Sequence, residues 1–210
     1  MTLTLICLTE AAAETAARLT SLWPGCRILG KRGRVPESAC DAFFDDAMQT
    51  IRGLFSDREA IIGVCSSAIL IRAVGDLLAD KASEAPVIAL AEDASSVVPL
   101  LGGHRGANRL ACEIAECLDA HAAITTAGDL RLDFSLDEPP AGWLLENPAL
   151  MKPVTAALLA GEPVALAVEA GDGSWPPATA FADKGAWRVL VTDRAGCADD
   201  RTLVIHPPVL

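Results

Sequence analysis

The alternation of short apolar stretches with segments of helical periodicity predicts an α/β fold for the larger part of this chain. Residues 60–65, 86–90 and 97–101 have the length and composition of buried strands, whereas apolar residues recur at helical spacing in 68–78 and 107–118. Such alternation is typical of a parallel sheet with helices on its faces. We expect an open, Rossmann-like parallel sheet flanked by helices, followed by a smaller α+β domain.

The composition is that of a globular protein, and its charge excludes several classes of partner. The 210 residues carry a net charge of −11 and include no tyrosine, so we expect neither nucleic acid nor an anionic membrane as a partner. No apolar stretch reaches the roughly 20 residues of a membrane span, and the first residues lack the basic start of a signal peptide. The seven cysteines show no metal-ligand spacing. We therefore expect a cytoplasmic protein with reduced thiols and no metal site.

Caps and periodicity predict the first elements in order. Residues 3–8 read as a strand, Thr9 can cap a helix that runs to Leu19, and residues 26–29 form a plausible second strand. The broad apolar face of residues 41–55 predicts one long helix. The stretches named above then supply the central strands and their helices.

A change of composition after residue 130 predicts a domain boundary. The last strand of the first domain is expected at 122–125, and turn-forming residues become frequent beyond it. We expect a first domain at 1–133 and a second at 134–210. The elements expected in the second are a helix at 147–159 and strands at 164–168, 187–191 and 202–205.

Polar and glycine-rich groups follow three of the predicted strands. Ser66 and Ser67 follow the first, the loop Gly102–Gly106 follows the third, and Thr125 and Thr126 end the last. Ligands of open parallel sheets bind beyond the carboxyl ends of the strands. We therefore expect these groups to converge at one edge of the sheet.

The glycine loop is the strongest of these features. Gly102, Gly103 and Gly106 let the backbone turn sharply and present amide groups to an anion at a helix start, although such loops also serve only to turn the chain. The spacing is neither that of the dinucleotide fingerprint nor that of a P-loop. His104 could act as a general base or acid, or could simply bond a loop carbonyl, and the pattern leaves both interpretations open.

The remaining polar candidates have weaker signals. Ser66 and Ser67 lack the context of a nucleophile elbow, so they are interpreted as helix caps or ligand contacts. Asn108 could cap its helix or act as a polar hook, and Cys65 is interpreted as a buried, inert thiol.

Two further features stay open. The basic cluster at 30–34 is either a solvated loop or a clamp for a polycarboxylate, because Arg pairs with carboxylates in bidentate fashion. His206 has no partner recognisable in the sequence and is interpreted as structural.

These motifs together carry a resemblance to a known family. They are Ile62–Ile69, Pro86–Ile88, Val97–Ala111 and Ala123–Ala127. In combination they resemble the N-terminal domain of the cobalamin-biosynthesis CbiG family, the cobalt-precorrin-5A hydrolases, and residues 137–206 are similar to that family's middle domain. The resemblance implies an enzyme of corrin-ring assembly that opens a lactone on a ring-contracted tetrapyrrole and releases a two-carbon unit as acetaldehyde.

The resemblance also gives the candidate residues a purpose. Lactone opening needs a base that activates water, and it needs hydrogen-bond donors that stabilise the oxyanion. His104 is the candidate catalytic base. The candidate substrate-binding residues are Ser66, Ser67, Gly102, Gly103, Arg105, Gly106, Asn108, Thr125 and Thr126. No cofactor is expected, and the tetrapyrrole substrate is expected either with cobalt or without it.

Two departures from the family pattern support an alternative. The family's loop usually reads Gly-His-x-Gly-Gly-Ala-Asn, whereas residues 103–108 are one glycine shorter, and the family's C-terminal domain is not expected here. Both features resemble the CbiG-like segment fused to precorrin-3B ring-contracting methyltransferases. The alternative function is therefore a non-catalytic tetrapyrrole-binding module that serves a precorrin methyltransferase.

Overall fold

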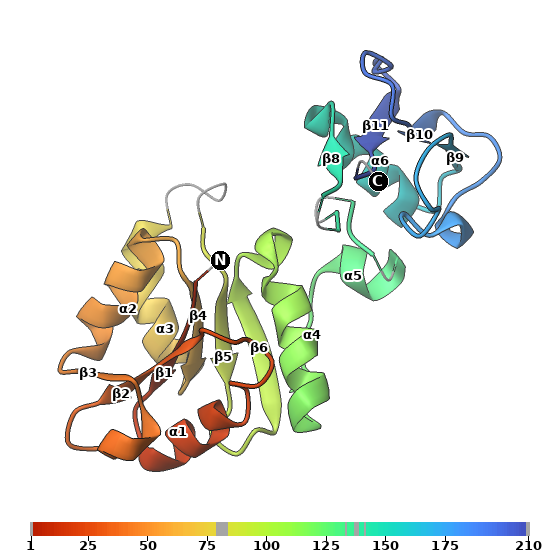
Figure 1. Cartoon of the computed structure of the whole chain (residues 1–210). Helices are drawn as coiled ribbons and strands as arrows, with labels where there is room; N and C mark the ends of the chain where they lie inside the picture. Colours follow the sequence, from red (N-terminus) through yellow and green to blue (C-terminus); the bar gives the residue numbers. More distant parts are fainter. Residues whose placement is uncertain (1, 79–83, 133, 137–138, 141, 209–210) are drawn as a thin grey trace. The chain divides into compact units, whose positions relative to one another are not determined.

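The computed structural model describes residues 2–78, 84–132, 134–136, 139–140 and 142–208, and it divides into two compact units (Figure 1). Unit 1 comprises Met1–Ile124 and unit 2 comprises Thr125–Leu210. The domain boundary expected at 133/134 stays a prediction. Among the described residues, no helix combines the length and apolar character needed to span a bilayer.

Unit 1 is built on a seven-stranded sheet with the order β3-β2-β1-β4-β5-β6-β7. The chain passes from β1 outward to β2 and β3, then returns to β4 beside β1 and continues to the other side. The junction of β1 and β4 is therefore a topological switch point. The strands are β1 (Leu3–Cys7), β2 (Arg27–Lys31), β3 (Ala42–Phe44), β4 (Ala60–Val64), β5 (Val87–Leu90), β6 (Ser96–Leu101) and β7 (His121–Ala122).

Four helices cover the two faces of this sheet, which confirms the α/β expectation. They are α1 (Glu10–Ala17), α2 (Ala47–Ser56), α3 (Ser67–Val74) and α4 (Ala107–Leu118). The buried side chains of α1 and α4 share one apolar cluster, and those of α2 and α3 share another. Thr9 caps α1 as expected, because its hydroxyl accepts the amide of Ala12 at 3.1 Å.

The single helix expected at 41–55 is wrong. Its first residues form the edge strand β3 (Ala42–Phe44), and α2 starts only after Asp46, whose carboxylate accepts the Gln49 amide at 3.0 Å. The capping carboxylate fixes the helix start. The apolar residues Phe43 and Phe44 fit a helix as well as they fit a short strand. The apolar pattern alone therefore does not show where the strand ends and the helix begins.

The parallel orientation expected for the central strands is also wrong for one strand. β6 pairs antiparallel with β5, with Val87 opposite Leu101 and Leu90 opposite Val97. Five residues, 91–95, connect the two strands, and a connection this short allows a hairpin but not a parallel crossover. The residues after β6 therefore leave the sheet at the edge where β4 and β5 begin.

Unit 2 contains a smaller four-stranded sheet of order β8-β11-β10-β9. β9, β10 and β11 run parallel, and β8, which the sequence analysis missed, pairs antiparallel with β11. The buried rings of Trp143 and Trp175 meet edge to face in its core, with centroids 5.3 Å apart. Its elements are α5 (Ala127–Leu132), β8 (Leu144–Leu145), α6 (Met151–Leu159), β9 (Val164–Val168), β10 (Trp187–Val191) and β11 (Thr202–His206).

Short 3₁₀ helices complete the secondary structure of the described residues. They are η1 (Glu37–Ala39), η2 (Gly75–Leu77), η4 (Gly103–Arg105), η5 (Pro148–Leu150) and η6 (Ala178–Ala180).

Two isoleucines test where the stability of unit 1 resides. Ile62 on β4 is fully buried, whereas Ile71 on α3 is 53% exposed. We predict that Ile62→Ala lowers the free energy of unfolding by about 2–5 kcal/mol, because it leaves a cavity in the central strand. Ile71→Ala should change it by no more than about 0.5 kcal/mol. Urea denaturation of both variants measures the difference, and equal losses would contradict the assignment of the core.

Candidate functional site

The glycine loop keeps the expected turn, and part of its hydrogen-bonding capacity is used internally. Gly102 and Gly106 both have left-handed backbone angles, with φ of 72° and 96°. The Gly102 carbonyl accepts the amides of Arg105 at 2.8 Å and Ala107 at 3.1 Å. These two amides close the loop on itself and start α4, so any ligand must use the other donors of the loop.

The loop packs closely against the chain segment that leads into β5. A Cβ atom on Gly102 would lie 2.9 Å from the Ala85 carbonyl oxygen and from backbone atoms of Pro86, which only glycine avoids. Asn108 is buried in α4, and a Cβ on Gly103 would lie 3.4 Å from its amide nitrogen. Asn108 therefore lies underneath the loop, where it supports the loop backbone.

The structure places the backbone of His104 in η4, at the edge of the sheet where β4 and β5 begin. We call this the amino edge, and the opposite edge, where these strands end, the carboxyl edge. The His104 side chain lies outside the described part of the structure, so its role as a base stays a prediction. Its neighbour Arg105 is exposed.

Ser66 and Ser67 lie at the other edge of the sheet. They follow β4, whose last residue Val64 pairs with Leu90 at the end of β5. Ser66 is the exposed N-cap residue of α3, and its side chain makes no capping hydrogen bond. Both serines therefore lie at the carboxyl edge, at the topological switch point.

The expected convergence of three groups at one edge is thus wrong. The residues of the glycine loop and Asn108 do lie together, at the amino edge, but Ser66 and Ser67 are at the carboxyl edge. Thr125 and Thr126 come after the short strand β7 and belong to unit 2. The individual binding roles of these residues stay predictions, because only their shared location is contradicted.

Most of the basic cluster at 30–34 is engaged by its neighbours. The Lys31 ammonium donates to the backbone carbonyl of Asp45, and Arg32 pairs with the Asp45 carboxylate at 3.0 Å. The Arg32 guanidinium also lies 5.2 Å from the centroid of the Phe43 ring. Arg34 is exposed, and its side chain has no hydrogen bond or ion pair with any described residue. The structure therefore leaves only Arg34 for the clamp interpretation.

His206, interpreted as structural from the sequence, has two partners in unit 2. Its Nδ1 lies 2.8 Å from the Thr192 carbonyl oxygen and its Nε2 lies 3.0 Å from a carboxylate oxygen of Glu146. The other Glu146 oxygen accepts the Gly196 amide at 3.2 Å. Because both ring nitrogens are occupied, His206 ties the ends of β10 and β11 to the segment after β8 and offers no free nitrogen for catalysis.

Within the described residues, no group of three or more His, Cys, Asp or Glu side chains has an arrangement that could hold a metal ion.

Comparisons with known proteins identify the family. Residues 49–129 match the model described as "Cobalamin synthesis G N-terminal", and residues 139–207 match "Cobalamin biosynthesis central region". The chain belongs to the CbiG family. The first match covers β4, the glycine loop and α4, so both candidate regions of unit 1 lie within the CbiG N-terminal domain.

Two curated relatives of this CbiG-family chain are named cobalt-precorrin-5A hydrolases. The protein from Priestia megaterium is 29% identical over 148 residues, and that from Salmonella typhimurium is 32% identical over 134 residues. The matches cover 69% and 63% of this chain but only 40% and 38% of the relatives. The chain thus spans about two fifths of their length.

A solved structure supports the fold of both units. The crystal structure of a putative cobalamin biosynthesis protein G homolog from Sulfolobus solfataricus matches with a TM-score of 0.56 at 18% identity. The match covers 98% of this chain and 60% of that one. At this identity the likeness shows that the two proteins share a fold.

Two glycines test how tightly the CbiG loop is packed. Gly102 and Gly33 have nearly the same φ, 72° and 74°, but a Cβ on Gly33 would meet nothing within 4 Å. We predict that Gly33→Ala costs about 1 kcal/mol from backbone strain alone. Gly102→Ala should cost at least about 1 kcal/mol more, because the backbone of 85–86 must move. Chemical denaturation of the two variants measures both losses of stability, and equal losses would show that the loop is not closely packed.

The thiols near the switch point should be unreactive. Burial raises the pKa of Cys65 to about 11, and burial together with the neighbouring Cys40 and Cys65 thiols raises that of Cys7 to about 12. We predict that iodoacetamide at pH 8 labels the exposed Cys112 and Cys117 first, because thiolates are the reacting species. Peptide mass spectrometry measures the order, and early labelling of Cys65 would contradict the inert interpretation.

Proposed function

We propose that this chain acts in cobalamin biosynthesis as a hydrolase that opens the lactone of a ring-contracted precorrin or cobalt-precorrin. The observation that carries the proposal is the match of its two regions to the N-terminal and central CbiG domains. Both curated relatives bear the name cobalt-precorrin-5A hydrolase. The tetrapyrrole substrate, with or without cobalt, and a cytoplasmic location are parts of this proposal.

The proposed reaction assigns roles to the glycine loop. A water molecule, deprotonated by His104, attacks the lactone carbonyl, and the ring C–O bond then breaks to leave a carboxylate and a hydroxyl group. The loop amides around Gly103 and Gly106 are the proposed donors for the tetrahedral oxyanion. Ser66, one of the candidate substrate-binding residues, lies at the opposite edge of the sheet, so this proposal assigns it no part in that step.

A second function is favoured by the loop itself. The sequence from Gly103 to Asn108 is one glycine shorter than the usual motif of the family it resembles, and the Arg105 and Ala107 amides are bonded within the loop. A shortened loop could retain tetrapyrrole binding and lose hydrolysis. In that case the chain would be a non-catalytic module that passes intermediates to a precorrin methyltransferase.

Incubation of the purified chain with the cobalt-precorrin-5A lactone separates the two functions. The hydrolase is expected to add one water to the lactone and to release the two-carbon unit as acetaldehyde, when the C–C bond between the new hydroxyl-bearing carbon and the macrocycle breaks and the macrocycle keeps the electron pair. Mass spectrometry measures both changes, and His104→Ala should abolish turnover without lowering the thermal unfolding midpoint. Ligand-induced stabilisation without turnover, unchanged in His104→Ala, would support the binding module. An absence of both turnover and stabilisation would contradict both functions.

A further inference from the structure

Arg58 occupies a backbone position at which glycine is usual. It follows α2 with φ of 60°, and the Arg58 amide bonds the Phe55 carbonyl while the Glu59 amide bonds the Leu54 carbonyl. This pair of bonds is the Schellman ending of a helix, whose left-handed residue is most often glycine because a Cβ is unfavourable there. An arginine at this position carries a backbone cost that its side chain does not recover through a hydrogen bond or ion pair with any described residue.

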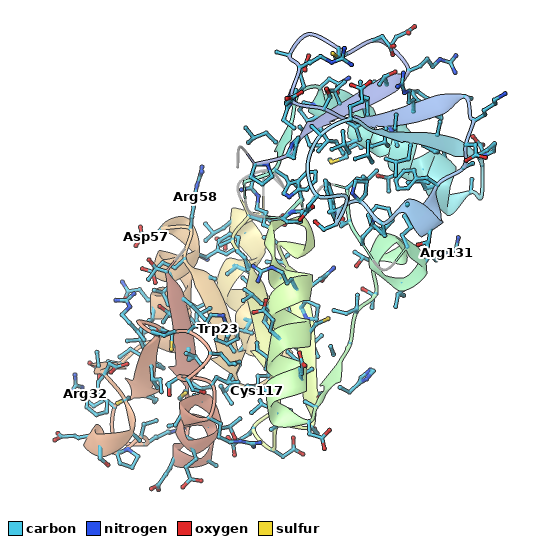
Figure 2. All side chains as sticks on the ribbon, turned by 45° about the vertical axis from the view of Figure 1, so that its right-hand side comes forward. Trp23, Arg32, Asp57, Arg58, Cys117 and Arg131 are labelled. Atoms are coloured by element: carbon cyan, nitrogen blue, oxygen red, sulfur yellow. The ribbon has the colours of Figure 1, made fainter. Side chains whose placement is uncertain are left out.

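The Arg58 side chain is exposed. Its guanidinium forms no hydrogen bond or ion pair with another described residue, and Figure 2 shows it extending away from the ribbon at one end of unit 1, with Arg32 at the other end. The nearby Glu59 carboxylate is instead held by Arg27 at 2.7 Å. Arg58 therefore presents a full, solvated positive charge.

Arg58 lies on the same edge of the sheet as the glycine loop. It precedes β4 by two residues, and the Ile61 amide at the start of β4 bonds the carbonyl of Pro86, against which Gly102 packs. β4 and β6 are separated by β5 alone, so the start of β4 and the end of β6 lie about two strand spacings apart at this edge, roughly 10 Å, with Arg58 just before the one and Arg105 just after the other. A tetrapyrrole macrocycle with carboxylates around its rim is of comparable width.

The carboxyl edge is unfavourable for such an anion. Exposed carboxylates follow β3 and β5 there, and the neighbouring Lys31 and Arg32 are already bound to Asp45. Exposed acidic side chains at this edge include Glu10, Asp46, Glu92, Asp93 and Asp119, together with Asp45, the partner of Arg32. The amino edge also carries the exposed carboxylates of Asp57 and Asp76, but Asp76 is paired with Arg52, and the guanidinium groups of Arg58 and Arg105 have no partner among the described residues.

We propose that Arg58 and Arg105 bind peripheral carboxylates of the tetrapyrrole at the amino edge of the sheet, one on each side of the start of β5. The inference rests on the proposed function and names the part of the surface that holds the substrate. Guanidinium groups suit this task because their planar fork bonds a carboxylate through two parallel hydrogen bonds. The two side chains hold the macrocycle over the glycine loop.

Binding of uroporphyrin, an octacarboxylate tetrapyrrole, to the full chain tests the proposal by fluorescence titration. Arg58→Gln and Arg105→Gln should each weaken binding about tenfold, since each removes a charge-assisted pair. The comparison variant is Arg34→Gln, which removes the exposed arginine left for the clamp interpretation at the carboxyl edge and should weaken binding less than twofold if the amino edge holds the ligand. Raising the salt concentration should reduce the effect of Arg58→Gln.

A second variant separates ligand binding from a purely structural role at the end of α2. Arg58→Gly relieves the left-handed strain, so its thermal midpoint should equal or exceed that of the wild type while binding still weakens about tenfold. Wild-type binding with no loss in Arg58→Gln, or an equal loss in Arg34→Gln, would overturn the assignment of the amino edge and leave the proposed function standing. If the wild type binds neither uroporphyrin nor the cobalt-precorrin-5A lactone, the proposed function fails as well.

Discussion

The antiparallel pairing of β6 with β5 determines where the glycine loop lies relative to the other candidate groups of unit 1. With Leu101 opposite Val87, the chain leaves β6 at the amino edge, and the glycine loop must form there. α4 then starts at that edge and crosses back along one face of the sheet to reach β7. A parallel β6 would instead have placed the loop beside Ser66. The direction of one strand thus divides the polar groups between two edges.

Much of the fold could be predicted from local patterns. β1, β4, β5, β9 and β10 are short apolar runs, and α1 has a threonine at its cap. The direction of β6 was also within reach, because five residues between Leu90 and Ser96 cannot form a parallel crossover. β3 was not, since the apolar residues Ala42–Phe44 fit a helix as well as a strand, and it is the pairing with β2, 13 residues earlier in the sequence, that makes them a strand.

The candidate site was predicted only in part, for a related reason. The glycine spacing at 102–106 identifies a turn, but its close contact with 85–86 depends on which strand lies alongside. His206 and Glu146 are separated by 60 residues, and no local pattern joins them. Arg58 carries no motif at all. Its left-handed position at the end of α2 appears only when the Schellman hydrogen bonds and φ are known.

Hydrogen exchange with uroporphyrin bound tests most directly which edge of the sheet holds the ligand. Amides that contact or lie beneath a bound macrocycle exchange more slowly, and mass spectrometry resolves the protected peptides. The amino-edge account predicts new protection in peptides that contain 57–59 and 102–109, with no change at 65–69. Protection at 65–69, with 57–59 and 102–109 unaffected, would contradict it.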